Sequence, residues 1–199
     1  MTAKENYSLF KGRIRTFRAC NGGLTPFVEK NNIVVYQAAD ILAQMMAGNT
    51  TYRPTHIGFL YAPTASVIPD PTTATPPREH TIDDIASDLQ AVTGNMVISA
   101  LARNVSVSVD GDAALYEGNK VSLYAISDSA GTPVFTGAGY AGAPTPGVDS
   151  YKQVALLTQI ISAGSPTPVY KLFARSALSV DFDVVTGFEL AAFWDISFF

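Results

Sequence analysis

The sequence has few of the residues that reaction and metal chemistry most often use. It holds one cysteine, Cys20, and two histidines, His56 and His80, among 199 residues. A single cysteine excludes an internal disulfide, which fits folding in a cytoplasm. Neither histidine stands in a motif that would activate the thiol, so we interpret Cys20 as a buried or idle side chain. A zinc site built from His and Cys would need more ligands than these.

Charge is also scarce. Only 15% of the residues are charged and the net charge is −4, whereas soluble domains carry about 25% charged residues. The one basic concentration, Lys11, Arg13, Arg15 and Arg18, is too small to predict a nucleic-acid partner. With 47% hydrophobic residues, two interpretations stay open: a surface covered by other subunits, or a monomer coated by Ser, Thr and Gly.

Long hydrophobic runs are missing. The segment "MTAKENYSLF" has no apolar signal core, and no run approaches the roughly 20 residues that span a bilayer. We therefore expect no membrane partner and no secretion. The sequons at Asn49 and Asn104 then carry little meaning.

One glycine-rich stretch, "FTGAGYAGAPTPG", matches the spacing of a dinucleotide-binding turn. Gly137, Gly139 and Gly142 give G-x-G-x-x-G, but that turn needs a helix opening at the third glycine. Pro144 and Pro146 block a helix there, so we expect a connection between strands and no cofactor. Walker and G-x-S-x-G motifs are absent as well.

Acidic residues give no stronger sign of chemistry. Asp110 and Asp112 lack the ligand spacing of an EF-hand loop, and a tight turn with solvated carboxylates is favoured over a cation site there. Carboxylates for sugar hydrolysis can converge from separate strands, yet nothing points to a particular pair. We predict that the chain is not an enzyme.

The clearest pattern in the sequence is the alternation of apolar and polar residues. Apolar and polar residues alternate along several segments separated by Gly, Pro, Ser and Asp, which favours antiparallel β structure over βαβ units. We predict a mainly β protein, a jelly-roll-like antiparallel β-sandwich, as one domain over 1–199; a split near Gly94 is the weaker alternative. The expected strands are 7–19, 33–35, 54–63, 95–111, 119–128, 151–161, 169–182 and 188–199.

Two helices are expected in the N-terminal half. Residues 33–47 carry an apolar stripe, and Gly48 stands where a C-terminal cap belongs. The stripe consists of Ala38, Ile41, Leu42, Met45 and Met46. A second helix is predicted over 81–94, with Thr81 as its N-cap.

The segment 64–80 is rich in Pro and Thr and has no periodic pattern. Loops of this length inside a domain usually have a role, and we expect an arm that binds a neighbouring protein. Its interface candidates are Pro69, Pro71, Pro76 and Pro77.

The last strand, 188–199, has two apolar sides. If the side with Trp194 faces the core, Phe193 and Phe199 lie on the other and are exposed unless a helix or another subunit covers them. Exposed aromatic residues often mark contacts, so both are interface candidates.

Three stretches resemble small virion structural proteins of tailed bacteriophages, of the capsid decoration or tail accessory type. They are "VVYQAADILAQMMAGNTTYRPTHIGFLY", "ALYEGNKVSLYAIS" and "ELAAFWDISFF". The resemblance implies a non-enzymatic virion protein, made in the bacterial cytoplasm and present in many copies as a homo-oligomer. Its partners would be other virion proteins, in the capsid or the tail.

The alternative function is a carbohydrate-binding β-sandwich that recognises a host receptor. Its candidates are Tyr140, Asp149 and Tyr151, in or beside the glycine-rich loop, because aromatic rings stack on sugars and carboxylates hold hydroxyl groups. A third interpretation, a polysaccharide-cleaving enzyme, has no identified residue.

Overall fold

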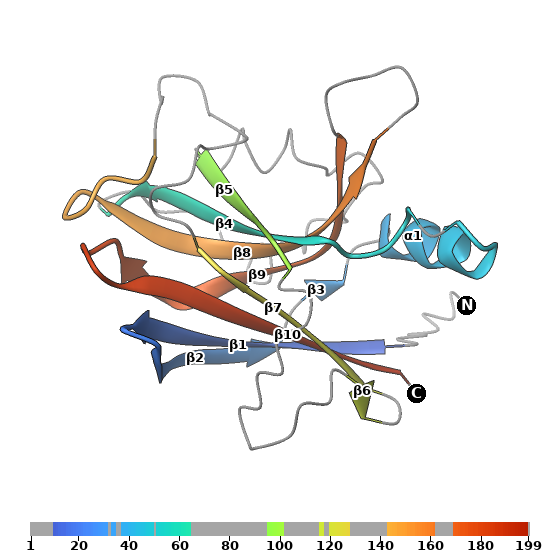
Figure 1. Ribbon diagram of the computed structural model, residues 1–199, viewed down its shortest axis with the longest axis horizontal. Coiled ribbons are helices and arrows are strands. Elements are labelled where there is room, and N and C mark those ends of the chain that lie inside the picture. The colour runs from blue at the N-terminus through green and yellow to red at the C-terminus, as the bar shows by residue number, and fades with distance from the viewer. Residues whose placement is uncertain are drawn as a thin grey trace, which may run out of the picture.

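Two antiparallel sheets and one helix make up the described part of the chain (Figure 1). The computed structural model describes residues 10–31, 33–34, 37–49, 51–64, 95–101, 116–117, 120–127, 143–161 and 169–198. Sheet I has the strand order β2-β1-β10-β7-β6, and sheet II has the order β3-β9-β8-β4-β5. The strands are β1 (Phe10–Cys20), β2 (Gly23–Asn31), β3 (Ile33–Val34), β4 (His56–Pro63), β5 (Asn95–Ala100), β6 (Tyr116–Glu117), β7 (Lys120–Ile126), β8 (Asp149–Ile160), β9 (Val169–Asp183) and β10 (Glu189–Phe198).

The two sheets share one hydrophobic core. Ile14 and Trp194 of sheet I and Phe59, Val154 and Phe173 of sheet II belong to the same buried cluster. Alternation places these side chains on the facing sides of the sheets, since successive residues of a strand point to opposite faces. The expected mainly β structure with antiparallel sheets is confirmed, and Trp194 lies on the core face, so Phe193 lies on the opposite side of β10.

Strand pairing joins residues that are far apart in the sequence. β1 pairs with β10 over nearly its whole length, from Phe10↔Phe198 to Ala19↔Glu189. β4 pairs with both β5 and β8. Each sheet therefore combines strands from both sides of Gly94, where the weaker alternative placed a domain boundary.

The sandwich has two distinguishable ends (Figure 1). We call the end with the β1–β2 turn, residues 143–149 and residues 184–188 the turn end, which lies at the left of the view. We call the end with α1 (Gln37–Met46) and the paired residues Ile160 and Val169 of β8 and β9 the helix end. Because β8 and β9 run the length of sheet II, a residue's position along them shows which end it belongs to.

A two-residue turn connects β1 to β2. Asn21 and Gly22 have φ angles of 48° and 79°, and Cys20 pairs with Gly23 across them. Positive φ at both central positions is the type I′ hairpin turn, for which Asn-Gly is the strongest short signal. β2, which follows this turn directly, is not among the strands expected from the sequence.

β2 is an edge strand, and its irregularities fit that position. A bulge lies where Thr16 pairs with Val28 and Phe17 with Pro26, and an edge strand tolerates a proline that cannot donate to the ladder. The Thr16 hydroxyl donates to the carbonyl of Val28 at 2.9 Å and accepts from its N–H at 3.1 Å. The extra residue, Phe27, packs edge-on against Phe182 in the core.

The first expected helix is present as α1. Ala38 and Ile41 are fully buried, and Asp40 in the first turn forms an ion pair with Lys171 of β9 at 2.8 Å. Met45 and Met46, expected in the buried stripe, are 40% and 90% exposed. This part of the expectation is wrong because α1 meets β9 through its first turns, and among the described strands none covers its last turn.

Gly48 ends α1 as predicted. Its φ is +86°, a conformation that side chains with a Cβ rarely adopt. The N–H of Gly48 donates to the carbonyl of Met45 at 3.0 Å, and that of Asn49 to the carbonyl of Gln44 at 2.9 Å. These two bonds form a Schellman motif. The second expected helix, 81–94, lies outside the described residues.

Candidate functional site: the turn end and the outer face of sheet I

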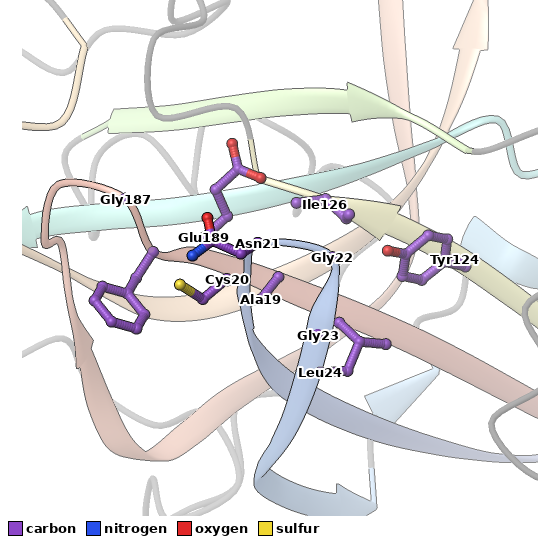
Figure 2. A pocket seen from close by; sticks show the side chains of 11 residues that line it. Ala19, Cys20, Asn21, Gly22, Gly23, Leu24, Tyr124, Ile126, Gly187 and Glu189 are labelled. Carbon is purple, nitrogen blue, oxygen red and sulfur yellow. The ribbon is translucent and has the colours of Figure 1, made fainter.

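A pocket of about 440 Å³ opens at the turn end (Figure 2). The β1–β2 turn forms one wall, the start of β10 another, and β7 contributes Tyr124 and Ile126. Small-molecule pockets commonly have volumes of roughly 300 to 1,000 Å³. The lining residues with long side chains are Leu24, Tyr124, Ile126, Phe188 and Glu189.

Tyr124 and Glu189 give this pocket its polar character. Figure 2 shows the Tyr124 hydroxyl pointing from β7 toward Ile126 and the β1–β2 turn, across the pocket from Cys20 and Glu189. Burial raises the pKa of Tyr124 above its ordinary value of 10.0, and the negative charge of Glu189 raises that pKa further. Tyr124 therefore stays a neutral hydrogen-bond donor at neutral pH.

An aromatic cluster continues from the pocket along the outer face of sheet I. The Phe193 ring lies 4.3 Å from the Tyr124 ring and 5.2 Å from the Phe17 ring, centroid to centroid. The Arg15 guanidinium lies 5.6 Å from the centre of the Phe193 ring, within the range of a cation–π contact. As a result Phe193 is only 3% exposed.

This burial corrects the expectation that Phe193 stays exposed unless a helix or another subunit covers it. Side chains of the neighbouring strands β1 and β7 cover its ring within the same sheet. Phe193 therefore offers no free aromatic surface to a partner in this structure.

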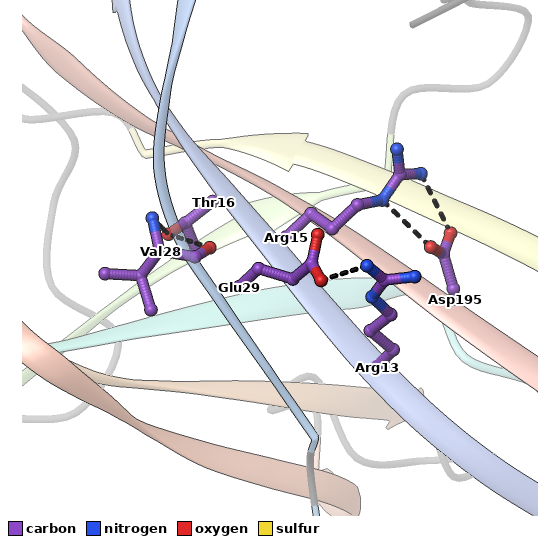
Figure 3. A network of polar contacts seen from close by, with 6 residues as sticks. All are labelled: Arg13, Arg15, Thr16, Val28, Glu29 and Asp195. Atoms are coloured by element: carbon purple, nitrogen blue, oxygen red, sulfur yellow. Dashed lines mark hydrogen bonds and ion pairs between the residues drawn. The ribbon is translucent and has the colours of Figure 1, made fainter.

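Charged side chains extend the same face beyond the aromatic cluster (Figure 3). Arg15 donates two hydrogen bonds to Asp195, Nε to Oδ2 at 2.9 Å and Nη2 to Oδ1 at 3.2 Å, and the Ser122 hydroxyl donates to Oδ1 at 2.6 Å. Bidentate Arg–carboxylate pairs are among the stronger polar contacts in proteins. Arg13 pairs with Glu29 nearby, where both side chains are half exposed. Arg13 and Arg15 thus lie on one face of β1, and each has a carboxylate partner.

The start of the expected arm is held firmly. Thr64 donates its N–H to the carbonyl of Val148 at 2.9 Å, and its hydroxyl lies 2.7 Å from that of Ser150. The buried ammonium of Lys152 donates to the carbonyl of Thr64 at 3.0 Å and forms an ion pair with Asp181. The arm residues that follow, including Pro69, Pro71, Pro76 and Pro77, lie outside the described residues.

The candidates for carbohydrate binding do not form a surface site. Asp149 and Tyr151 are each 1% exposed. The Asp149 carboxylate accepts the N–H of Thr145 at 2.7 Å, and the Tyr151 ring packs among Phe59, Tyr61 and Phe182. The expectation that these two side chains are available to a sugar is corrected: the carboxylate fixes a turn, and the ring belongs to the core.

Several other expected features fall outside the described residues. These are Phe199, Tyr140, the glycines at 137, 139 and 142, and the pair Asp110 and Asp112. Within the described ranges, no group of three or more His, Cys, Asp and Glu side chains is arranged to hold a metal ion. The described part also contains no helix with the length and apolar character needed to cross a membrane.

The exposed large hydrophobic residues among the described ones lie toward the two ends of the sandwich. Met45 and Met46 end α1, while Ile161 and Val169 lie at the neighbouring ends of β8 and β9, so all four belong to the helix end. At the turn end the exposed set is Leu24, Val148, Val180 and Val185. Sequence reasoning assigned Met45 and Met46 to the core and did not identify the other six. The Asn-Gly turn was the available signal for the pocket wall at Leu24.

The described residues form a mainly β protein of two stacked antiparallel sheets. Hydrophobic residues are exposed toward both ends, and a pocket lies beside the β1–β2 turn. The chain matches no protein-family model, and no curated protein or solved structure is significantly similar to it.

Proposed function

We propose that this protein is a non-enzymatic structural component of a bacteriophage virion, present in many copies and bound to capsid or tail neighbours. This is the role that the resemblance of the three sequence stretches implies. The proposal includes assembly in the bacterial cytoplasm and a final location in the virion.

The observation that carries the proposal is the position of the exposed hydrophobic residues. They lie at the two ends of the sandwich, four at each end among the described residues, and Met46 is 90% exposed. Isolated exposed apolar residues are normal, but gathered ones mark contact surfaces. Contacts at both ends suit a protein that is built into an array.

The strand order supports the finer, jelly-roll-like topology that the proposal includes. The first strand pairs with the last in sheet I, and β3 pairs with β9 in sheet II. Jelly rolls share this pairing of early with late strands, although the hairpins β1–β2 and β8–β9, which each stay within one sheet, depart from a jelly roll, where most consecutive strands alternate between the sheets. Jelly rolls are frequent in viral capsid proteins.

The test is the composition of virions purified from the phage that encodes the chain. Quantitative mass spectrometry of the particles is expected to find the chain at many copies per virion, and labelled antibodies are expected to place it on the head or the tail. A chain that is expressed during infection but missing from purified particles would contradict the proposal.

A further inference from the structure

The helix end and the turn end differ in shape. The helix end projects the last turn of α1, with Met46 the most exposed of the large hydrophobic side chains that the structure describes. The turn end is hollowed by the pocket between the β1–β2 turn and β10. Because these features lie at opposite ends of the sandwich (Figure 1), a protomer cannot fill its own pocket with its own Met46.

We propose that copies of this chain bind head to tail, with the last turn of α1 of one copy seated in the turn-end pocket of the next. The occupant of the pocket is thus the Met46 side chain of a second copy, with Met45 beside it. This inference rests on the proposed assembly role and names the contact that performs it.

The chemistry of the pocket suits methionine. Leu24, Ile126 and Phe188 supply apolar and aromatic walls, and Tyr124 adds a second ring. Methionine is flexible enough to fill an irregular space, and its sulfur makes favourable contacts with aromatic rings. Docking would remove Met46 from water and cover Leu24, which is 37% exposed.

Charge favours the same orientation. Glu189 lines the pocket, and Asp181 and Asp183 are exposed at the turn end, where the basic groups are the exposed Arg18 and the buried Lys152, which is paired with Asp181. At the helix end, Arg53 is exposed in the turn that follows α1, while the acidic Asp40 of α1 is paired with Lys171. Complementary charge steers association and disfavours the reversed pairing, in which two acidic turn ends would meet.

A contact between two different surfaces has a consequence for assembly. It is heterologous, so every added copy presents the same free pocket and the same free α1, and the series closes into a ring or extends as a filament. A contact of this kind gives many copies from a single interface.

The single natural cysteine makes the contact testable, because Cys20 lines the pocket. One chain carries Met46→Cys and Cys20→Ser, so that its only thiol is on α1. The other is the unchanged chain, whose only thiol is in the pocket. The two chains carry tags of different size, are mixed, and are treated with a short thiol-specific bifunctional crosslinker. A control chain with Asn31→Cys and Cys20→Ser places the thiol on an exposed residue of β2 instead.

Head-to-tail binding is expected to yield a crosslinked heterodimer in the mixture. This product is expected to be lost when the pocket chain carries Leu24→Lys, and also when the control chain replaces the α1 chain. Crosslinked homodimers of the α1 chain alone would show that two helix ends meet, and would overturn the proposal. So would equal heterodimer yields from the Met46→Cys and Asn31→Cys chains.

Sedimentation of the same samples separates this inference from the proposed function. If the chain self-associates, or is abundant in virions, while no heterodimer forms, the contact is wrong and the structural role stands. If the chain stays monomeric at all concentrations and is missing from virions, both proposals fail.

Discussion

Large side chains on the two faces of sheet I are buried to a similar degree by different means. On the inner face, Ile14 and Trp194 meet apolar side chains of sheet II. On the outer face, Phe193 and Phe17 are 3% and 7% exposed, yet their neighbours include Arg15, whose guanidinium lies over a ring while it pairs with Asp195. Long charged side chains can cover apolar surface with their stems while their heads stay near water. Equal burial therefore does not mean equal packing, and the following substitutions measure the difference.

The largest expected effect comes from removing a phenylalanine, either Phe59 of sheet II, which belongs to the core cluster on the inner side of sheet I, or Phe193 on the outer face of sheet I. Phe59→Ala empties a fully buried position between the sheets and is expected to lower the free energy of unfolding by about 3 to 5 kcal/mol. Phe193→Ala is expected to cost less, about 2 to 3 kcal/mol, because Arg15 and Tyr124 can move into the space and water can reach it. Urea unfolding followed by tryptophan fluorescence measures both.

The two variants share the same chemical change, so each serves as the other's control. An equal or larger loss for Phe193→Ala would mean that the outer cluster is packed as tightly as the interior, and the distinction between the two faces would be wrong.

The next effect compares two ion pairs on the outer face. Asp195 is 4% exposed and accepts hydrogen bonds from Arg15 and Ser122, so Asp195→Asn is expected to cost about 1.5 to 3 kcal/mol, the range for hydrogen bonds to charged groups. The Glu29 side chain, paired with Arg13, is 53% exposed. Glu29→Gln is expected to cost less than about 1 kcal/mol, because exposed pairs contribute little.

Added salt is expected to separate the contributions of these two ion pairs to stability further. Raising the ionic strength is expected to remove the small contribution of the Glu29 pair and to leave most of the Asp195 effect, since partly buried pairs are screened less. Equal losses in urea unfolding for Asp195→Asn and Glu29→Gln would contradict the ranking.

Sequence patterns were most informative about strand faces. Alternation along the last strand placed Trp194 and Phe193 on opposite sides, because successive residues of a strand point to opposite faces. It contained no information on pairing, and the contact between β1 and β10 joins the two ends of the described chain. β2 was missed because Gly23 and Pro26 resemble a loop, although Asn21-Gly22 is a hairpin signal.

The site was harder to predict than the fold. The pattern correctly placed Phe193 opposite Trp194, but its burial depends on the register that sets Arg15 and Tyr124 beside it on neighbouring strands. That register links positions about 70 to 180 residues apart, which no local pattern contains. For the same reason the pocket, whose walls come from β1, β2, β7 and β10, is not visible in the sequence.

The smallest expected effect concerns the Tyr124 hydroxyl, where the outer face meets the pocket. Burial and the Glu189 charge hold the pKa of Tyr124 above 10.0. Above about pH 10 the unfolded chain therefore loses this proton before the folded chain does, so stability falls as the pH rises through this range. Tyr124→Phe is expected to lessen the fall in unfolding free energy between about pH 9 and pH 11, because the variant has no proton to lose there.

Glu189→Gln is the matched test of the cause. It removes the negative charge and leaves the burial, so the pKa of Tyr124 is expected to move part of the way back toward 10.0. The chain has nine tyrosines, so phenolate absorbance alone does not isolate Tyr124. Subtracting the titration curve of each variant from that of the unchanged chain leaves the change at Tyr124. A Glu189→Gln chain that titrates like the original would mean that burial alone raises the pKa. The charge of Glu189 would then have no measurable effect on the Tyr124 hydroxyl, although both side chains line the pocket.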